Sequence, residues 1–414
     1  MSEADQYELL SPRQRAGLHR FVYHGGDSSL LYKFILSPMA QWLVDTIIPL
    51  WMAPNVVTTI GLLFNIASAV LVVLFNPELS ATGPHVAWVA GVSAVGMFLY
   101  QTFDNMDGKQ ARKTGLQSPL GLLFDHGCDA LNAGLSVLPV ASSLGLGWSR
   151  KLLFNLIPLI PFYVQTWELF YVKSMILPII NGPSEGLVIA CSMMLVTYFT
   201  GSATWFHTTQ TVFGHSVVPY DFMVLFGFTG AGITLVMQCF NVYRALKRDL
   251  KGSDLLSGIV SAFSNLVVFT LFFGSVLLWC TSPGSIALAP RFRWWTLLLV
   301  SSVFVEIVSH INLMHITMEP ELHPWKRYSV LSTVYLAICT LPMLKARLPF
   351  FLREESVLVL LSLVTAYITF RTLHLMNTEV AQVLGIQVFL IGPPLKKEVV
   401  MKPSTRSQTG NKRD

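Results

Sequence analysis

Charged residues are scarce in this sequence: Asp, Glu, Lys and Arg make up only 12% of 414 residues, whereas 53% are hydrophobic. A soluble domain carries about 25% charged residues, because its surface must be solvated. No polar domain interrupts the apolar runs between residues 58 and 376, which excludes a set of soluble domains joined by linkers. The composition therefore predicts a polytopic membrane protein in contact with the lipid bilayer.

Three other features are rare or missing. The five cysteines lie within apolar segments, at spacings that match neither a disulfide framework nor a zinc site. Residues 1–28 contain no apolar stretch typical of a cleaved signal peptide, so we expect the transmembrane helices themselves to direct targeting. The net charge is +5, but its Lys and Arg are scattered over short loops and form no basic stripe. We therefore expect no nucleic-acid partner.

What is present is a series of apolar runs, each long enough to cross the hydrocarbon core as a helix of about 20 residues. They predict an all-α protein with about ten transmembrane helices, at 58–76, 86–103, 120–144, 152–172, 186–201, 220–243, 255–281, 294–316, 327–344 and 356–376. An even number of crossings places both termini on one side of the membrane. Lys and Arg are somewhat more frequent in the loops on that side, so we expect cytosolic termini.

The apolar runs divide the chain into four expected regions. Residues 1–57 form a cytosolic N-terminus whose segment 29–51 mixes large apolar and polar side chains and predicts an interfacial amphipathic helix. An ordinary surface helix is the alternative for that segment. Residues 58–201 contain the helices with the polar cluster described next, residues 202–376 contain the remaining crossings, and residues 377–414 form a basic tail that we expect to be disordered.

Four aspartates gather at the junction of the second and third runs. Asp104 and Asp107 are three residues apart, and Asp125 and Asp129 are four apart, so each pair shares one face of its helix. Two facing helices would bring the four carboxylates together at the membrane boundary, where repulsion and desolvation require a compensating cation. Oxygen ligands favour Mg²⁺ or Mn²⁺. The pattern therefore predicts a divalent metal site, and we expect it to hold two ions.

Small residues and an arginine accompany the aspartates. Gly108 and Ala111, with Gly121 on the facing helix, leave space beside the carboxylates. Arg112 can reach that space with a guanidinium group suited to phosphate, so the set predicts a nucleotide-diphosphate site. A cation transporter that uses the Asp cluster is the alternative from another class. A cation pathway, however, gains nothing from an arginine.

The complete pattern D-x2-D-G-x2-A-R-x8-G-x3-D-x3-D, from Asp104 to Asp129, resembles the signature of the CDP-alcohol phosphotransferase class-I family. Residues 51–58 (WMAPNVVT) and 181–186 (NGPSEG) are similar to the eukaryotic choline/ethanolaminephosphotransferase branch. The resemblance implies transfer of phosphocholine or phosphoethanolamine from CDP-choline or CDP-ethanolamine to diacylglycerol, with release of CMP. It also implies a membrane of the endoplasmic reticulum or Golgi, with the site facing the cytosol. Another acceptor or donor alcohol, such as inositol, is the alternative within the family.

The resemblance also implies roles for individual residues. Those expected to hold metal and pyrophosphate are Asp104, Asp107, Asp125 and Asp129, and those expected to contact the CDP-alcohol are Asn55, Gly108, Ala111, Arg112 and Gly121.

The base that accepts the acceptor's hydroxyl proton has two candidates. Asp129 is the usual base in the wider family, whereas an imidazole with a pKa of about 6.5 favours His126 here. His126 could instead only orient a metal-ligating aspartate. Leu122 stands where relatives of this branch usually carry Glu, so the partner that orients His126 is not evident from the sequence.

Two weaker patterns concern the head group and the assembly. Glu168 and Glu185, near the cytosolic ends of their runs, are candidates for binding an ammonium group. The small residues Gly227, Gly230 and Gly232 allow close helix packing, from which we expect a homodimer contact.

Overall fold

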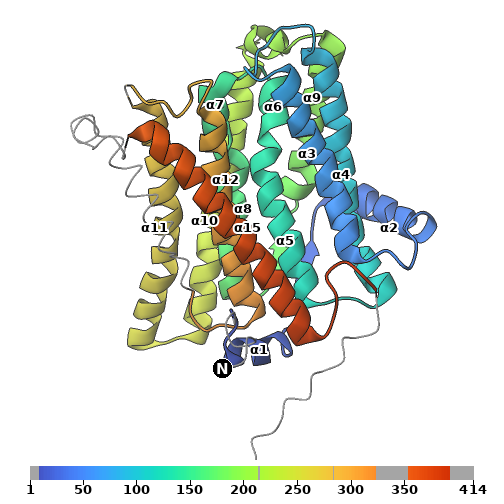
Figure 1. Cartoon of the computed structure of the whole chain (residues 1–414), viewed down its shortest axis with the longest axis vertical. Coiled ribbons are helices and arrows are strands. Elements are labelled where there is room, and N and C mark those ends of the chain that lie inside the picture. The colour runs from blue at the N-terminus through green and yellow to red at the C-terminus, as the bar shows by residue number, and fades with distance from the viewer. Residues whose placement is uncertain (1–8, 213–214, 283, 323–352, 392–414) are drawn as a thin grey trace, which may run out of the picture.

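The computed structural model describes residues 9–212, 215–282, 284–322 and 353–391. Helices dominate this part of the chain, so the predicted all-α class is confirmed. Most of the long helices run side by side in one bundle, while α15 crosses it diagonally (Figure 1). The long helices are α3 (Pro54–Phe75), α4 (Val86–Thr114), α5 (Pro119–Leu135), α8 (Leu156–Val172), α9 (Leu187–Thr200), α10 (Pro219–Asp249), α11 (Gly252–Thr281), α12 (Arg293–Ile316) and α15 (Glu354–Leu384).

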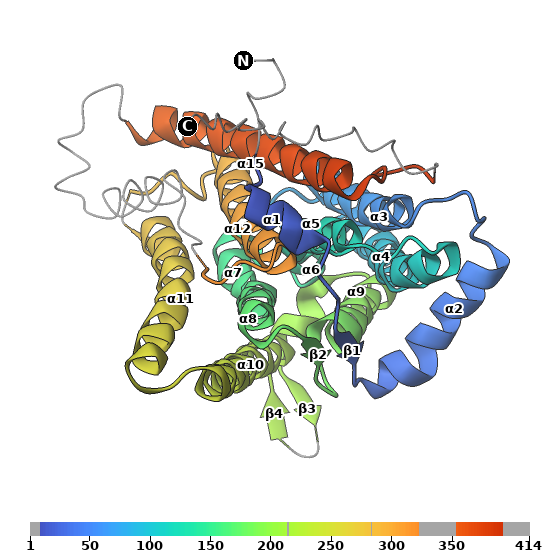
Figure 2. The same cartoon turned by 90° about the horizontal axis from the view of Figure 1, so that it is seen from below.

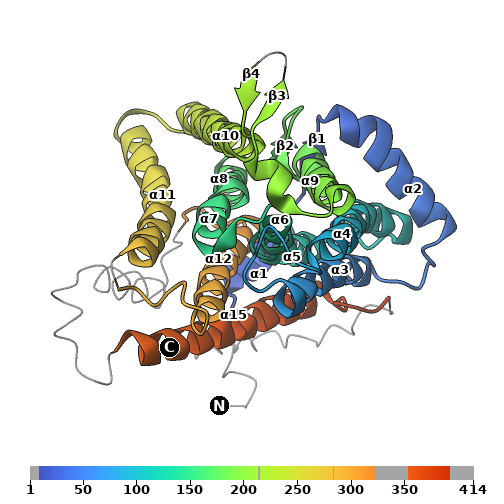
Figure 3. The same ribbon diagram turned by 90° about the horizontal axis from the view of Figure 1, so that it is seen from above.

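Short elements connect the long helices. The helical ones are α1 (Pro12–Leu18), a π-helical turn at Tyr32–Leu36, α2 (Ser37–Thr46), α6 (Val137–Ser143), α7 (Gly147–Phe154), a π-helical turn at Gly182–Gly186 and a 3-10 helix at Ala203–His207. The strand β1 (Gly25–Asp27) pairs in parallel with β2 (Met175–Leu177), with Gly25 opposite Met175. The strands β3 (Gln210–Val212) and β4 (His215–Val217) form an antiparallel hairpin that projects from the bundle (Figure 3).

Seven helical segments within the described ranges are long and apolar enough to cross a membrane, in agreement with a polytopic protein. They are Pro54–Phe75, Val86–Thr114, Gly182–Thr200, Pro219–Asp249, Gly252–Thr281, Arg293–Ile316 and Glu354–Leu384. The runs predicted at 120–144 and 152–172 are also helical, but each is divided into two helices. The run predicted at 327–344 lies outside the described residues.

Prolines account for both divisions. Pro139 has no amide hydrogen to donate to the carbonyl of Leu135, where α5 ends. Pro158 likewise cannot donate to the carbonyl of Phe154, where α7 ends. Apolar runs give no sign of these breaks, because a proline hardly lowers the hydropathy of the segment around it.

The helix α12 is the scaffold of the bundle. In its most apolar stretch 78% of the residues are buried, compared with 11% for α10, so α12 lies inside the bundle whereas α10 leaves an apolar face uncovered. Viewed from below, α12 lies between α15 and α8, and α10 and α11 lie at the edge (Figure 2). The core around α12 includes Trp167, Trp279 and Phe304.

The helices α3 and α4 pack closely because two glycines lie between them. A Cβ atom at Gly96 would lie 2.3 Å from the Ser68 hydroxyl oxygen and 3.1 Å from the Phe64 carbonyl oxygen. A Cβ atom at Gly61 would lie 2.8 Å from the Cβ atom of Phe103. This close approach fixes the position of the C-terminal half of α4, which contains Asp104 and Asp107.

Gly96→Val is expected to lower the melting temperature of the protein in detergent, because the added methyl groups would push α3 away from α4. Overpacking of this kind costs about 1–3 kcal/mol. Gly274→Val is the matched control, since a Cβ atom at Gly274 in α11 would meet nothing within 4 Å. Equal melting temperatures for the two variants would contradict the close packing of α3 on α4.

The N-terminal segment lies beneath α12 and α15 (Figure 2). The Glu379 carboxylate accepts hydrogen bonds from the backbone amides of Leu9 and Leu10, at 2.7 and 3.0 Å, and pairs with Arg15 at 3.0 Å. A Cβ atom at Gly17 would lie only 1.9 Å from the Thr317 carbonyl oxygen, so α1 rests directly on the chain that follows α12. Because α15 continues to Leu384, it extends into the region that we expected to be tail.

The helix α2 lies outside the bundle and runs across the direction of the long helices (Figures 1 and 2). Its exposed side includes Trp42, while Ala40 and Val44 are buried. The Lys113 ammonium group donates hydrogen bonds to the Val44 and Ile48 carbonyls at 2.6 and 3.2 Å and ties α2 to the end of α4. This orientation, with an apolar face uncovered, suits a helix that lies in the membrane interface.

Candidate active site

A tight turn brings the two aspartate-bearing helices together. The helix α4 ends at Thr114 and is capped by Gly115, whose φ of 71° lies in the left-handed region that glycine adopts readily. The helix α5 begins at Pro119 after Ser118, whose hydroxyl accepts a hydrogen bond from the Gly121 amide at 3.3 Å. Residues 115–118 therefore reverse the chain so that the end of α4 faces the start of α5.

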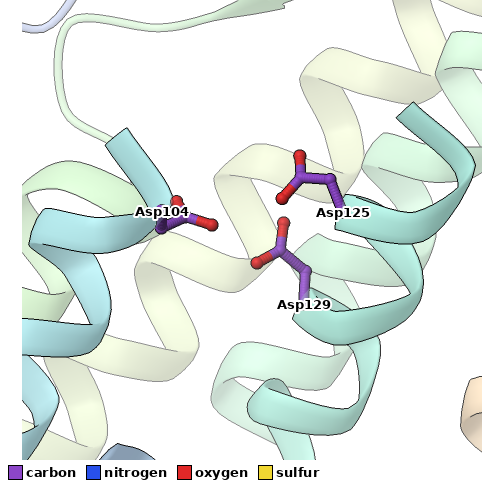
Figure 4. Close-up of side chains that lie close together, drawn as sticks. All are labelled: Asp104, Asp125 and Asp129. Atoms are coloured by element: carbon purple, nitrogen blue, oxygen red, sulfur yellow. The ribbon is translucent and has the colours of Figure 1, made fainter. Parts of the chain in front are cut away.

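Three of the four predicted aspartates converge between these helices. Asp104 of α4 points toward Asp125 and Asp129 of α5 (Figure 4), and one carboxylate oxygen from each lies within 4.8 Å of the other two. Asp107 lies beside this group, within hydrogen-bonding reach of the Asp125 carboxyl group. The Asp107 carboxylate also accepts a hydrogen bond from the Thr58 hydroxyl at 2.5 Å.

The carboxylate cluster has the chemistry of a divalent metal site. The Asp125 Oδ1 atom is buried and has no hydrogen-bond partner among the described residues. Carboxylates this close repel each other unless a proton or a cation lies between them. A set of hard oxygen donors with one unsatisfied buried oxygen fits a hard divalent metal ion, which prefers such ligands.

Two hydroxyl groups that support the cluster were not recognised in the sequence. The Tyr100 hydroxyl donates a hydrogen bond to Asp129, and the Thr58 hydroxyl holds Asp107. Tyr100 precedes Asp104 by one helical turn, and Thr58 follows Asn55 by about one turn, so both lie on the face that carries a predicted site residue. Helical spacing was therefore an available signal for both hydroxyls.

His126 lies next to the carboxylates and contacts a residue far away in the sequence. Its imidazole Nδ1 atom is 3.1 Å from the Asn312 Oδ1 atom of α12, and both side chains are buried. His126 also lies close enough to Asp129 for an electrostatic interaction. Because an amide oxygen only accepts, this contact places the proton on Nδ1 and leaves a lone pair on Nε2. Asn312 is therefore a polar neighbour that can orient the imidazole, which Leu122, an apolar side chain, cannot do.

The predicted donor-binding residues border open space. A Cβ atom at Gly108 would meet only the Arg112 Nη1 atom, at 3.8 Å, and one at Gly121 would meet only the Ser118 hydroxyl, at 3.9 Å. Arg112 is exposed and has no carboxylate partner among the described residues, and Ala111 beside it is half-buried. A phosphate group can therefore approach the end of α4 without displacing side chains.

Asn55 lies at the same end of the bundle but is engaged elsewhere. It is buried at the start of α3, and its amide nitrogen donates to the Val388 carbonyl at 2.9 Å. The neighbouring Phe389 packs edge-on against Phe124 of α5. The segment after α15 therefore covers Asn55 rather than leaving its amide directed at an open space.

The N-terminal segment reaches the carboxylates as well. Although the Tyr23 side chain is 49% exposed, partial desolvation of its hydroxyl and the neighbouring Asp125 carboxylate raise its pKa to about 12, so the hydroxyl stays protonated at neutral pH and is a hydrogen-bond donor. Ser29 donates a hydrogen bond to Glu185, whose other oxygen accepts from the Asn181 amide at 2.9 Å. Glu185 therefore holds the NGPSEG segment against the N-terminus in this structure.

Fold and site together define a class of protein. A polytopic helical bundle that carries clustered carboxylates, an open glycine-lined space and an arginine suited to phosphate is a membrane enzyme that acts on a phosphate ester.

Comparison with known proteins identifies the family. A family model described as CDP-alcohol phosphatidyltransferase matches residues 51–217, which include all four aspartates. Choline/ethanolaminephosphotransferase 1 of Arabidopsis thaliana is 35% identical over 343 residues, which cover 80% of this chain and 85% of that protein. Cholinephosphotransferase 1 of Saccharomyces cerevisiae is 32% identical over 314 residues, or 73% of this chain and 78% of that protein. The chain therefore belongs to the CDP-alcohol phosphatidyltransferase family and is a phosphotransferase, as the motif predicted.

Proposed function

We propose that the protein transfers phosphocholine or phosphoethanolamine from CDP-choline or CDP-ethanolamine to diacylglycerol and releases CMP. The observation that carries this proposal is the cluster of Asp104, Asp125 and Asp129 beside the open space at Gly108. Relatives that share most of the chain are named for choline and ethanolamine. A relative with another reaction, the CDP-diacylglycerol–serine O-phosphatidyltransferase of Encephalitozoon cuniculi, covers only 46% of the chain.

The four aspartates would hold one or two Mg²⁺ or Mn²⁺ ions together with the pyrophosphate. When bound, such ions neutralise the charge on the diphosphate and stabilise CMP as the leaving group. Thr58 and Tyr100 fix two of the carboxylates through their hydroxyl groups. The Arg112 guanidinium binds the CDP phosphates, and Gly108, Ala111 and Gly121 let them approach.

His126 is our choice for the general base. As the acceptor hydroxyl oxygen forms a bond to the phosphorus that carries the head group, the bond from that phosphorus to the CMP oxygen breaks. The hydroxyl proton passes to the His126 Nε2 atom, which keeps its lone pair because Nδ1 faces the Asn312 oxygen. Asp129, held by Tyr100 and close to His126, is the alternative base.

Purified protein with Mg²⁺ and diacylglycerol tests the function directly. With labelled CDP-choline or CDP-ethanolamine, we expect CMP and the corresponding phospholipid in equal amounts. CDP-diacylglycerol offered with inositol or serine is the control for another acceptor alcohol and should yield no CMP. Absence of CMP release from both CDP-alcohols, or release only from CDP-diacylglycerol, would contradict the proposal.

Arg112→Lys is expected to raise the KM for CDP-choline by about tenfold, because lysine keeps the charge but loses the bidentate geometry. The kcat value should change less. Arg291→Lys is the matched control, since Arg291 lies beside Phe292 before α12 and not at the site. Steady-state kinetics that leave Arg112→Lys equal to the wild type would remove Arg112 from the phosphate site.

We place the protein in the endoplasmic reticulum or Golgi, as the family resemblance implies. The site would face the cytosol, because the junction of α4 and α5 lies at the same end of the bundle as α1, on the side where the Lys and Arg distribution predicts the termini (Figure 1). A homodimer through α10 is also part of the proposal. In α10, Gly230 and Gly232 face open space, whereas a Cβ atom at Gly227 would meet Ile157 at 2.7 Å. Gly227 therefore serves packing within the chain, and only the other two glycines are free for a partner.

A further inference from the structure

A large, open cavity lies between the C-terminal ends of α8 and α10. Its volume is about 970 Å³, and its walls come from α8, α10, the loop that contains β2, and Ser28 of the N-terminal segment. This volume is at the upper end of the range of about 300–1,000 Å³ that is typical of small-molecule sites. The cavity is therefore large enough for a lipid head group and its glycerol backbone.

One wall of the cavity carries a buried carboxylate. Glu168 of α8 is only 7% exposed and lines the cavity. Its two oxygens accept hydrogen bonds from the Asn241 amide at 2.7 Å and the Gln165 amide at 3.0 Å. No Lys, Arg or His forms an ion pair with Glu168 among the described residues. A buried carboxylate without a cation is costly, so this wall favours a cationic ligand group.

The facing wall carries two arginines one helical turn apart. Arg244 and Arg248 of α10 both line the cavity. Arg248 is bound to the neighbouring Asp249 carboxylate, at 2.7 and 3.1 Å. Arg244 lies over the Phe240 ring at 4.1 Å and has no carboxylate partner in the described part of the chain. Its guanidinium group is thus available to a phosphate. Because Asn241 precedes Arg244 by three residues, the anionic and cationic walls lie about one turn apart.

The lip of the cavity is apolar and exposed. Ile179 and Ile180, in the loop after β2, are 60% and 72% exposed, and Met237 of α10 is 52% exposed. All three line the cavity, and the exposed apolar face of α10 continues from Met237 toward Ile233. An aliphatic chain that starts in the cavity can therefore continue along α10 into the bilayer.

We infer that this cavity binds a zwitterionic glycerophospholipid. Its ammonium group would lie at Glu168, its phosphate at Arg244, and its acyl chains along the apolar lip. Phosphatidylcholine and phosphatidylethanolamine have this chemistry, so the inference that the site receives the enzyme's product rests on the proposed function.

Lipid binding to the delipidated full-length protein in detergent tests this inference. Native mass spectrometry would compare dioleoyl-phosphatidylcholine, dioleoyl-phosphatidylglycerol and dioleoylglycerol. The wild type should bind phosphatidylcholine at least about tenfold more tightly than either of the other two, since phosphatidylglycerol lacks the ammonium group and dioleoylglycerol lacks both charged groups. Glu168→Gln should remove the preference for phosphatidylcholine over phosphatidylglycerol. Arg244→Gln should weaken binding of both phospholipids, and Arg291→Gln, outside the cavity, should change neither.

Several results would overturn the inference. If phosphatidylglycerol binds more tightly than phosphatidylcholine, the cavity is a site for anionic lipids. If dioleoylglycerol binds as tightly as phosphatidylcholine, the cavity is a site through which the acceptor diacylglycerol enters. Unchanged phosphatidylcholine binding in both cavity variants would show that the lipid does not bind in this cavity. Because Arg244 is exposed, its variant remains informative even if Glu168→Gln is unstable. CMP release by the same preparations separates the two proposals. A wild type that binds phosphatidylcholine selectively but releases no CMP would refute only the function.

Discussion

Asp125→Ala is expected to lower turnover by at least about 10³-fold, because loss of several kcal/mol of charge stabilisation in the transition state costs a factor of ten for each 1.36 kcal/mol. Asp125 is central to the cluster: it lies within reach of Asp104, Asp107 and Asp129, and one of its oxygens is buried without a hydrogen bond. Asp125→Asn should lower turnover by nearly the same factor, since the amide side chain keeps the shape of the carboxylate but not its charge. CMP release at saturating CDP-choline measures both.

The control for this prediction is Asp254→Ala, which removes an exposed carboxylate from the first turn of α11. It should retain wild-type turnover. Excess chelator should abolish wild-type activity, and added Mg²⁺ or Mn²⁺ should restore it. An Asp125→Ala enzyme with more than a tenth of wild-type activity, or a wild type that is indifferent to chelator, would contradict a carboxylate-bound metal.

His126→Ala is expected to reduce kcat by about 10²–10⁴-fold with little change in the KM for CDP-choline, because a general base acts on the acceptor rather than on donor binding. Asn312→Ala should reduce kcat by about 10–100-fold, the usual effect of losing a residue that orients a functional side chain. Asn312→Asp keeps an oxygen acceptor facing Nδ1 and should recover most of that loss.

Asn265→Ala is the matched control for Asn312, because Asn265 is also a buried amide, but it binds the Tyr171 hydroxyl, away from the carboxylates. It should leave kcat unchanged even if the protein becomes less stable. A His126→Ala enzyme that keeps most of its turnover would transfer the base role to Asp129. An inactive Asn312→Asp enzyme beside an active Asn312→Ala enzyme would mean that the amide donates to the imidazole.

The aspartates could be predicted from the sequence because their spacing is local. Helical periodicity places Asp104 and Asp107 on one face of the first helix, and Asp125 and Asp129 on one face of the second. The turn between these helices is only four residues long, so the end of the first helix lies close to the start of the second. Asn312 could not be predicted, because it contacts His126 across 186 residues and only the packing of α12 against α5 brings them together. The cavity at Glu168 likewise depends on the packing of α8 against α10, and no local sequence pattern predicts that these two helices are neighbours.

The fold was predictable to the extent that hydropathy controls it. Apolar runs located the long helices, because burying backbone hydrogen bonds in lipid allows few alternatives to a helix. They did not reveal that α4 continues past residue 103 to Thr114, since its last turns are polar and carry the site. They also did not reveal the divisions at Pro139 and Pro158, where a missing amide hydrogen, rather than polarity, interrupts the helix.

Electron paramagnetic resonance of Mn²⁺ tests the central claim most directly. Wild-type protein in detergent would be titrated with Mn²⁺ with and without CDP-choline, beside Asp125→Ala. The metal site predicts saturable Mn²⁺ binding to the wild type, a change in the bound spectrum when CDP-choline is added, and loss of both in the variant. Equal Mn²⁺ binding by the two proteins, or a bound spectrum that ignores CDP-choline, would contradict a site in which these aspartates hold the metal for the CDP-alcohol.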